Sequence, residues 1–373
     1  MFPVAGEPDA VPTDATDAMD AGGEQVCGGR HRPTALFRDC VTAAPEVLTS
    51  TPAIDTGAPG SMGDCTQVIA QEDAAHTELC VIAAHEIQIG TTIVVGSRPL
   101  LLASATTLTV AGVLTVASPN GALGAGANFA SCSSMLEGNG APGSEGAGGG
   151  AGGSFATVGG NGGFGFGNHA GGFSELDTSP VAVVRGGCPG GKGGNNDLLG
   201  NSGGLGGNGG GAIYLLATAS IVIENRVDAS GGGGFAGLVT PMGGGGGGGG
   251  GSGGLIALDA AEITVVETAR LIANGGGGGA GGPPSPGPIG MNGESPDPTG
   301  YPFIASGGQA IGAGNGGPGG NAEQLAAGNP IDGGDNFTVA GGGGGGGGGG
   351  LGYIYIFGPL TNKSVTASPN LSD

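Results

Sequence analysis

The sequence predicts an all-β fold, a short parallel β-helix of about five coils, with glycine-rich insertions that form a bundle of polyglycine II helices. Three observations lead to this fold class. Short apolar strands recur at a spacing of about 21 residues. Glycine accounts for 95 of the 373 residues. These glycines are collected in blocks that lie between the recurring strands.

The repeat is clearest between residues 79 and 118. Five apolar positions of the first copy return in the second copy: Val81, Ile87, Ile89, Ile93 and Val95 correspond to Leu102, Leu108, Val110, Leu114 and Val116. Further copies begin near Leu215, Leu255 and Tyr353. Alternating apolar residues indicate strands, and strands this short must stack on neighbours to be stable. The alternative is a β-sandwich built from the same strands.

The glycine blocks form three insertions, at residues 119–211, 231–254 and 275–350. Each leaves after a small polar turn and returns just before the next strand, so the insertions are expected to emerge on one face. One interpretation is flexible linker. The other is an ordered bundle of extended helices with three residues per turn. Without Cβ atoms, such helices can approach until their N–H and C=O groups pair.

The rest of the chain divides by composition. Residues 1–26 are rich in Asp and Glu and hold no Lys or Arg, which predicts an acidic, solvated spacer. Residues 27–79 are expected to form a disulfide-tied N-terminal cap over the first coil. Residues 80–369 hold the expected β-solenoid with its insertions.

Cysteine usage indicates the compartment. The six cysteines are even in number and spread without a CxxC motif, which favours disulfides in an oxidising environment. The disulfide candidates are Cys27, Cys40, Cys65, Cys80, Cys132 and Cys188. A bond between Cys132 and Cys188 would close a loop of about 55 residues within the first insertion. Free buried thiols are the alternative, and the connectivity is open.

Charge and hydropathy exclude several classes of partner. The net charge of -21 repels nucleic acid and anionic membranes. No apolar stretch is long enough for a transmembrane segment. The first residues, Met1-Phe2-Pro3, show no signal peptide. The cysteines nevertheless favour an extracellular or cell-surface protein.

No residues are assigned to catalysis, to a cofactor or to a metal, and the protein is not expected to be an enzyme. The acidic residues expected on outer faces do not form an obvious cluster: Glu86, Glu224, Asp228, Asp259, Glu262 and Glu267. Arg226 and Arg270 occupy equivalent positions of adjacent copies. A solvated ladder of salt bridges explains this pair better than a catalytic site does. There is no Trp, so no aromatic stripe can line a sugar groove.

The passages GGAIYLLATASIVIENRVDASGGGG and GGGSGGLIALDAAEITVVETARLIANGGGGG carry a resemblance. Over residues 80–369 the chain resembles glycine-rich, lipoprotein-like surface proteins predicted in myxobacteria. The resemblance implies a cell-envelope or secreted protein and carries no activity with it. More loosely, the blocks are similar to the adhesins at the tips of T-even phage tail fibres. In those adhesins polyglycine helices stack into a slab whose end loops bind receptors.

These observations predict a non-enzymatic structural protein of the cell surface or matrix, self-associating as a filament subunit. The expected assembly edge is the last apolar strand, made of Tyr353, Ile354, Tyr355, Ile356 and Phe357, because an open edge can pair with another chain. The alternative is an adhesin or binding protein for a receptor, a glycan or ice. Its binding loops would be residues 164–176 and 292–303.

Overall fold

The computed structural model describes residues 23–30, 35–49, 51–57, 62–71, 78–129, 132, 138–175, 181–196, 202–241, 243–301, 303–321, 341–361 and 365–372. This part of the chain contains β-strands, one 3-10 turn at Pro119–Gly121 and no α-helix. Most of the predicted acidic spacer lies outside the described residues. The strands are β1 Glu24–Cys27, β2 Cys40–Thr49, β3 Ala53–Asp55, β4 Gln67–Ile69, β5 Leu79–Ile89, β6 Thr92–Val95, β7 Leu100–Ser104, β8 Thr107–Val110, β9 Val113–Thr115, β10 Ala212–Ile223, β11 Arg226–Asp228, β12 Leu255–Val265, β13 Arg270–Ile272, β14 Tyr353–Phe357 and β15 Thr366–Ser368.

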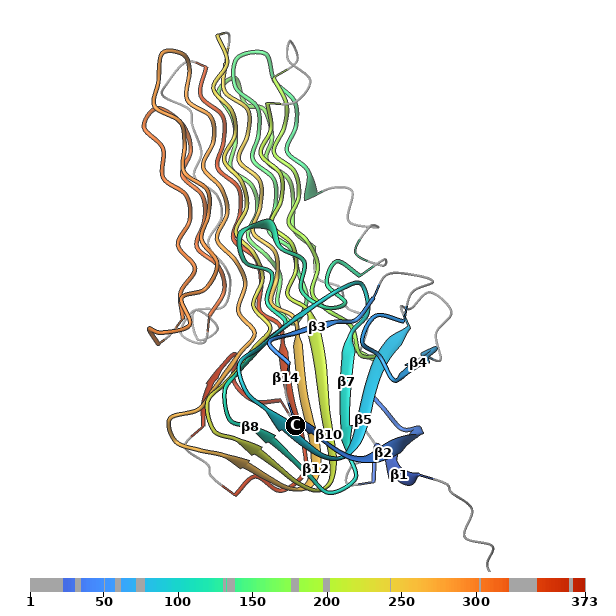
Figure 1. The fold of residues 1–373 in the computed structure, drawn as a ribbon. Helices are drawn as coiled ribbons and strands as arrows, with labels where there is room; N and C mark the ends of the chain where they lie inside the picture. Colours follow the sequence, from blue (N-terminus) through green and yellow to red (C-terminus); the bar gives the residue numbers. More distant parts are fainter. Residues whose placement is uncertain are drawn as a thin grey trace, which may run out of the picture.

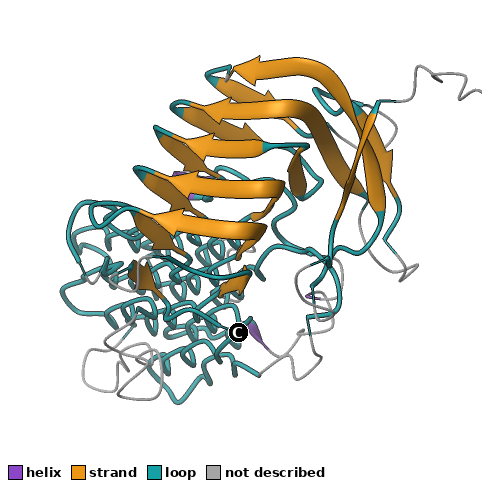
Figure 2. Ribbon diagram, turned by 90° about the horizontal axis from the view of Figure 1, so that it is seen from below, coloured by secondary structure: helices purple, strands orange, loops and turns teal. Residues whose placement is uncertain are grey.

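The strands form two sheets, whose stacked strands are visible in Figure 2. The larger sheet has nine strands, with the order β1-β2-β5-β7-β10-β12-β14 and with β4 and β8 also paired in it. The smaller sheet has six strands in the order β15-β13-β11-β9-β6-β3. Most pairs are parallel, but β1 and β4 pair antiparallel with β2 and β5 at one side of the larger sheet. The residues assigned to the N-terminal cap therefore contribute strands to both sheets.

Equivalent residues of the repeat lie on neighbouring parallel strands. Leu108 pairs with Ile221, and Leu215 pairs with Leu258. The main core lies between the two sheets, because buried side chains of both sheets belong to one cluster that includes Leu102, Leu215, Leu258, Val227 and Leu271. A second cluster covers the other face of the larger sheet and includes Leu101, Tyr214, Phe37 and Phe155.

At the start of the repeat, the prediction of which residues face the core is wrong by one position. Val81 pairs with Leu101, and Ile82 pairs with Leu102. Further along, Thr92 pairs with Leu114, so Ile93 is 54% exposed and Val95 is 40% exposed, whereas Val94 is buried. Side chains of a strand alternate between faces, so a shift of one residue exchanges the inner and outer sets.

The predicted fold class, a β-helix of about five coils, is wrong. The structure is all-β, but its strands form two separate sheets of unequal strand number, with antiparallel strands at one side, instead of one coil repeated along an axis. Two sheets around a common core are closer to the sandwich alternative, although the pairing is mainly parallel. The hydrophobic spacing predicts parallel neighbours; it does not predict how many sheets those neighbours form.

The three insertions leave the sheets and run side by side as a glycine bundle, seen in Figure 1 as the long wavy segments above the strands. We use this name for the described residues of the insertions. Residues 244–254, the central segment, run through the bundle with neighbours on all sides. The N–H groups of Gly246 and Gly249 donate to residues 194 and 191, those of Gly247 and Gly250 to residues 344 and 347, and those of Gly248 and Gly251 to residues 235 and 232.

The carbonyl groups of the central segment follow the same rhythm. Gly246 accepts from Gly204, Gly247 from Gly150, and Gly248 from Gly279, each at 2.8–2.9 Å. Every third residue therefore faces the same neighbour, which is the period of an extended helix with three residues per turn. A flexible linker would not pair its backbone in this way.

One segment from each insertion takes part in a hydrogen-bond cycle that passes through all three insertions and returns to the first segment three residues earlier. Gly150 N–H donates to Gly247, Gly247 N–H donates to Gly344, and Gly344 N–H donates to the carbonyl of Ala147. The same cycle recurs three residues later with Gly153, Gly250 and Gly347. The insertions thus stabilise one another although they are far apart in the sequence.

The outer segments carry a side chain at every third position. The stretches GGNGGF at 159–164 and GGLGGN at 203–208 show this Gly-Gly-X spacing. Several Asn side chains of the outer segments accept hydrogen bonds from backbone N–H groups. Asn161 Oδ1 accepts from Ser174 at 3.0 Å, Asn292 Oδ1 from Ala236 at 2.9 Å, and Asn315 Oδ1 from Ala310 at 2.9 Å. Side chains at the rim thus replace the backbone partners that interior segments have.

Candidate functional site

The six cysteines form three disulfides, and no cysteine is free. Cys27 bonds to Cys40, Cys65 to Cys80, and Cys132 to Cys188. The first bond ties β1 to β2, the second ties the segment before β4 to β5, and the third lies within the first insertion. Three disulfides fit an extracellular protein, because such bonds persist in oxidising compartments.

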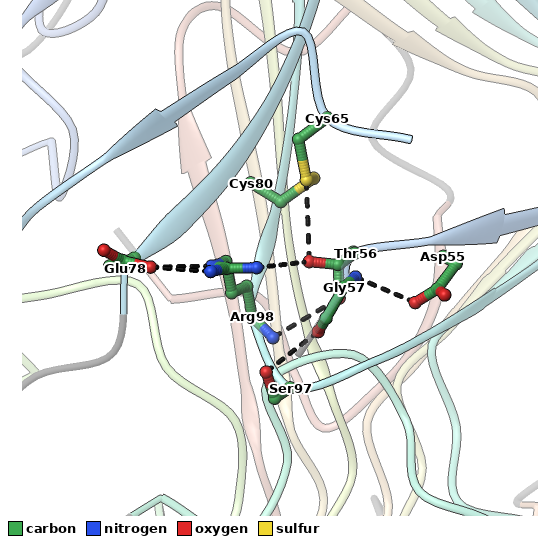
Figure 3. Close-up of polar contacts among 8 residues, drawn as sticks. All are labelled: Asp55, Thr56, Gly57, Cys65, Glu78, Cys80, Ser97 and Arg98. Atoms are coloured by element: carbon green, nitrogen blue, oxygen red, sulfur yellow. Dashed lines mark hydrogen bonds and ion pairs between the residues drawn. A yellow bond between two sulfur atoms is a disulfide. The ribbon is translucent and has the colours of Figure 1, made fainter. Parts of the chain in front are cut away.

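A buried arginine supports the Cys65–Cys80 region (Figure 3). Arg98 is 4% exposed, and its guanidinium donates to Glu78 Oε2 at 2.7 and 2.9 Å and to the Thr56 carbonyl at 3.1 Å. Cys65 Sγ also contacts that carbonyl, at 3.5 Å. These contacts join the segment before β7 to the residue after β3 and to the residue before β5, so we assign Arg98 a structural role.

The proposed assembly edge, Tyr353–Phe357, is strand β14 and lies at the end of the larger sheet. Its aromatic side chains form a stacked row, with ring centroids 5.3 Å apart for Tyr353 and Tyr355 and 5.6 Å apart for Tyr355 and Phe357. Burial, and then the neighbouring Tyr353, raise the pKa of Tyr355 to about 12. Ser372 forms a bridge with β14: its N–H donates to the carbonyl of Ile354, and its carbonyl accepts from the N–H of Ile356. The chain itself therefore occupies the middle of this edge.

The carboxylates expected on outer faces include two that are buried. Asp259 is 0% exposed and accepts from Tyr214 Oη at 2.9 Å and from Gly29 N–H at 3.0 Å. Burial, with the adjacent Asp259, raises the pKa of Tyr214 well above its usual value. Asp228 is 7% exposed, and burial raises its pKa, while bonds from Ser230 and the charge of Arg226 oppose that shift. Neither carboxylate is accessible to a substrate.

Arg226 and Arg270 are register partners on β11 and β13, so the structure brings this pair together. Arg270 Nη1 donates to the carbonyls of Pro298 and Thr299, at 2.7 and 3.1 Å. Among the described residues, no group of three or more His, Cys, Asp and Glu side chains could hold a metal ion.

A set of exposed apolar side chains on adjoining segments of the glycine bundle forms a candidate surface, which we call the apolar face. It consists of Leu205, Leu238, Ile289 and Met291, whose exposed fractions are 61%, 54%, 76% and 61%. These residues lie on adjoining segments, because Phe235 N–H donates to Leu205 O and Ala236 N–H donates to Asn292 Oδ1. Leu205 stands in a Gly-Gly-X stretch, but no spacing in the sequence links it to Leu238, Ile289 and Met291.

The two expected binding loops do not share one end of the bundle. Phe166 N–H donates to Gly342, near the start of the last glycine segment and far from the strand that follows it. Residues 298 and 299 instead contact Arg270 of β13, beside the sheets. The two segments therefore lie at different places along the bundle, because the chain turns back toward the sheets after residue 294. Residue 176 lies outside the described residues.

The described part of the chain contains no helix long and apolar enough to cross a membrane. The chain matches no family model, no curated protein and no solved structure. The surfaces described above therefore carry the functional argument.

Proposed function

We propose that the chain is a non-enzymatic, extracellular structural protein that self-associates through the apolar face of its glycine bundle. The observation that carries this proposal is that Leu205, Leu238, Ile289 and Met291, each more than half exposed, lie on adjoining segments of an ordered bundle. Large exposed apolar groups that are contiguous mark interaction sites more often than ordinary surface.

The distribution of charge supports a second copy of the chain as the occupant. The stretches 201–223, 229–258 and 273–293, which supply the face, contain no Asp, Glu, Lys or Arg. The chain as a whole carries a net charge of -21, so two copies repel one another over most of their surfaces. Two copies that meet on this face avoid the cost of burying or juxtaposing like charges.

The magnitudes support weak, reversible association. Complete burial of a Leu, Ile or Met side chain contributes roughly 1.5–3 kcal/mol. The four side chains are already partly buried in the single chain, so the burial of each on association contributes about half of that free energy. The same four side chains contribute from the second copy. Association costs about 4–15 kcal/mol in lost freedom of motion. The balance supports pairs that form at high local concentration, as in a matrix or on a cell surface.

Sedimentation velocity over a wide range of protein concentration tests the proposal. The natural chain is expected to show a concentration-dependent rise in sedimentation coefficient. The double variant Leu238→Ser/Ile289→Ser is expected to weaken association at least about tenfold, which corresponds to about 1.4 kcal/mol.

The matched control is Ile93→Ser, because Ile93 is also more than half exposed, at 54%, and lies on β6 rather than on the bundle. This variant is expected to associate like the natural chain. A monomer at every concentration, or equal weakening by the control, contradicts the proposal.

A further inference from the structure

We propose that a cavity of about 420 Å³ beside β13 and β15 binds a neutral pyranose sugar of a glycan. The polar and aromatic residues that line it are Glu267, Thr268, Arg270, Tyr301, Thr366 and Asn370. The cavity is separate from the apolar face and does not depend on self-association.

Two sheet residues and two turns define the cavity. Arg270 and Thr366 are register partners on β13 and β15, and both are half-buried. Glu267 and Thr268 belong to the turn between β12 and β13, and Asn370 follows β15. Tyr301 comes from the segment that follows residue 294, which lies over Arg270. Polar groups from separate parts of the chain thus converge on one hollow.

Arg270 fixes the segment that carries Tyr301. Its Nη1 donates to the carbonyls of Pro298 and Thr299. Its guanidinium carbon lies 5.6 Å from the ring centroid of Phe303. These two hydrogen bonds and the ring contact all hold one short segment. The position of this segment relative to the sheet is therefore set before a ligand arrives.

Phe303 anchors the same segment in a conformation that aromatic residues rarely adopt. Its φ angle is 60°, its side chain is 0% exposed, and its carbonyl accepts from Asn274 Nδ2 at 3.0 Å. A bulky residue at positive φ persists only where its surroundings impose it, and such residues are enriched at binding sites. Tyr301 packs edge-to-face on Phe303 with ring centroids 5.5 Å apart, so the strained anchor supports the exposed ring.

The lining suits a sugar. The Tyr301 side chain is 58% exposed and offers an apolar ring surface for the C–H face of a pyranose. Glu267 accepts hydrogen bonds, Arg270 donates them, and Asn370, Thr268 and Thr366 do both, as the hydroxyl groups of a sugar require. The volume lies within the range of about 300–1,000 Å³ that is usual for small-ligand sites.

Charge favours a neutral sugar over an acidic one. Among the described residues of the lining, Glu267 and Arg270 balance each other, and the net charge of -21 repels anionic glycans. Tyr301 is the one aromatic residue among the described residues of the lining. A single ring stacks on a single sugar, so the site is suited to a terminal or branch residue rather than to a long chain.

Saturation-transfer NMR and calorimetry with a defined panel test this proposal on the full chain. The probes are the methyl glycosides of glucose, galactose and mannose, together with N-acetylglucosamine and glucuronate. At least one neutral probe is expected to bind saturably with a Kd of about 1 mM, which corresponds to a binding free energy of about −4 kcal/mol. Glucuronate is expected to bind more weakly.

The variants separate the site from the rest of the molecule. Tyr301→Ala is expected to weaken binding at least tenfold, Tyr301→Phe to retain most of it, and Glu267→Gln to weaken it. The matched control is Tyr353→Phe, on β14 outside the cavity, which is expected to change nothing. Absence of saturable binding by every neutral probe, or binding that is indifferent to Tyr301→Ala, overturns the proposal. Sedimentation of the same samples reports on self-association independently.

Discussion

Single glycines of the central segment have no room for a side chain. A Cβ atom added at Gly249 would overlap the carbonyl of Ala151. Because this carbonyl belongs to a packed neighbouring segment, it cannot move aside without disturbing further hydrogen bonds. We expect Gly249→Ala to lower the free energy of unfolding by about 3 kcal/mol or more, at the upper end of the cost of overpacking. Chemical denaturation measures the change.

Gly138→Ala is the matched control for this substitution. A Cβ atom at Gly138 would have its nearest neighbours at 3.9–4.0 Å, which is ordinary contact distance. The control is therefore expected to change stability by less than about 1 kcal/mol. Equal effects of the two substitutions would show that the bundle is loosely packed.

A second prediction at the residue scale concerns the buried carboxyl of Asp228. Burial raises its pKa in the folded state, above the unfolded value of about 3.9. The folded state then binds the proton more tightly, so stability is greatest below the unfolded pKa and falls as pH rises toward the folded pKa. Asp228→Asn removes this decline, while Oδ1 can still accept from Ser230 N–H, as it does now at 3.0 Å.

Urea denaturation of both proteins at a series of pH values checks this prediction. The stability of Asp228→Asn relative to the natural chain is expected to increase from about pH 4 toward neutral pH. A difference that stays constant over this range would mean that Asp228 is not the titrating group.

At the scale of elements, the Cys132–Cys188 disulfide constrains the first insertion. The two cysteines are separated by 56 residues, and loop closure of this length contributes about 4 kcal/mol in the chain-entropy model. We expect Cys132→Ser/Cys188→Ser to speed hydrogen exchange in residues 138–195 far more than in β10 and β12. Hydrogen-exchange mass spectrometry resolves these regions.

The control for that experiment is Cys27→Ser/Cys40→Ser. This pair has a sequence separation of 13 and ties β1 to β2, at the end of the larger sheet away from β14. Its removal is expected to loosen the N-terminal strands and to leave exchange in the insertion unchanged. Uniform acceleration in both variants would count against a local role for Cys132–Cys188.

The sequence predicts the elements better than their assembly. Apolar residues that recur at a constant spacing predict parallel neighbours such as Leu215 and Leu258. The spacing shifts by one residue twice, once between β7 and β8, which both pair with β5, and again between β8 and β9, and these shifts produced the wrong inner faces. The number of sheets depends on contacts between strands that are distant in sequence. The spacing of apolar residues carries no information about those contacts.

The candidate surfaces were predictable only in part. The edge strand of Tyr353 and Phe357 is visible in the sequence as an apolar alternation, but its pairing with Ser372 is a long-range contact. The apolar face is spread over residues 205–291, and only the packing of the bundle brings its side chains together. The sugar cavity combines residues from 267 to 370, so no local motif marks it.

At the scale of the whole molecule, charge and the apolar face act in opposite directions. A net charge of -21 keeps copies apart at low ionic strength. At about 1 M salt the Debye length falls to about 3 Å, so this repulsion is screened while apolar contact remains. We expect self-association to increase with sodium chloride, and more strongly with sulfate.

Light scattering at fixed protein concentration measures this dependence. The variant Leu238→Ser/Ile289→Ser is expected to stay monomeric at salt concentrations where the natural chain associates. Association that weakens with added salt would indicate contacts between opposite charges instead of the apolar face.

The three-residue period of the bundle also restricts how the lengths of its segments can change in evolution. Inserting one residue before Gly249 would rotate every later residue of that segment by a third of a turn about the helix axis. Each later N–H group would then point at a different neighbouring segment from the one to which it now donates. Inserting three residues would leave the direction of every bond intact. Natural variation in these segments should therefore occur in whole triplets of residues, as addition or loss of complete turns, while the turns between segments vary freely.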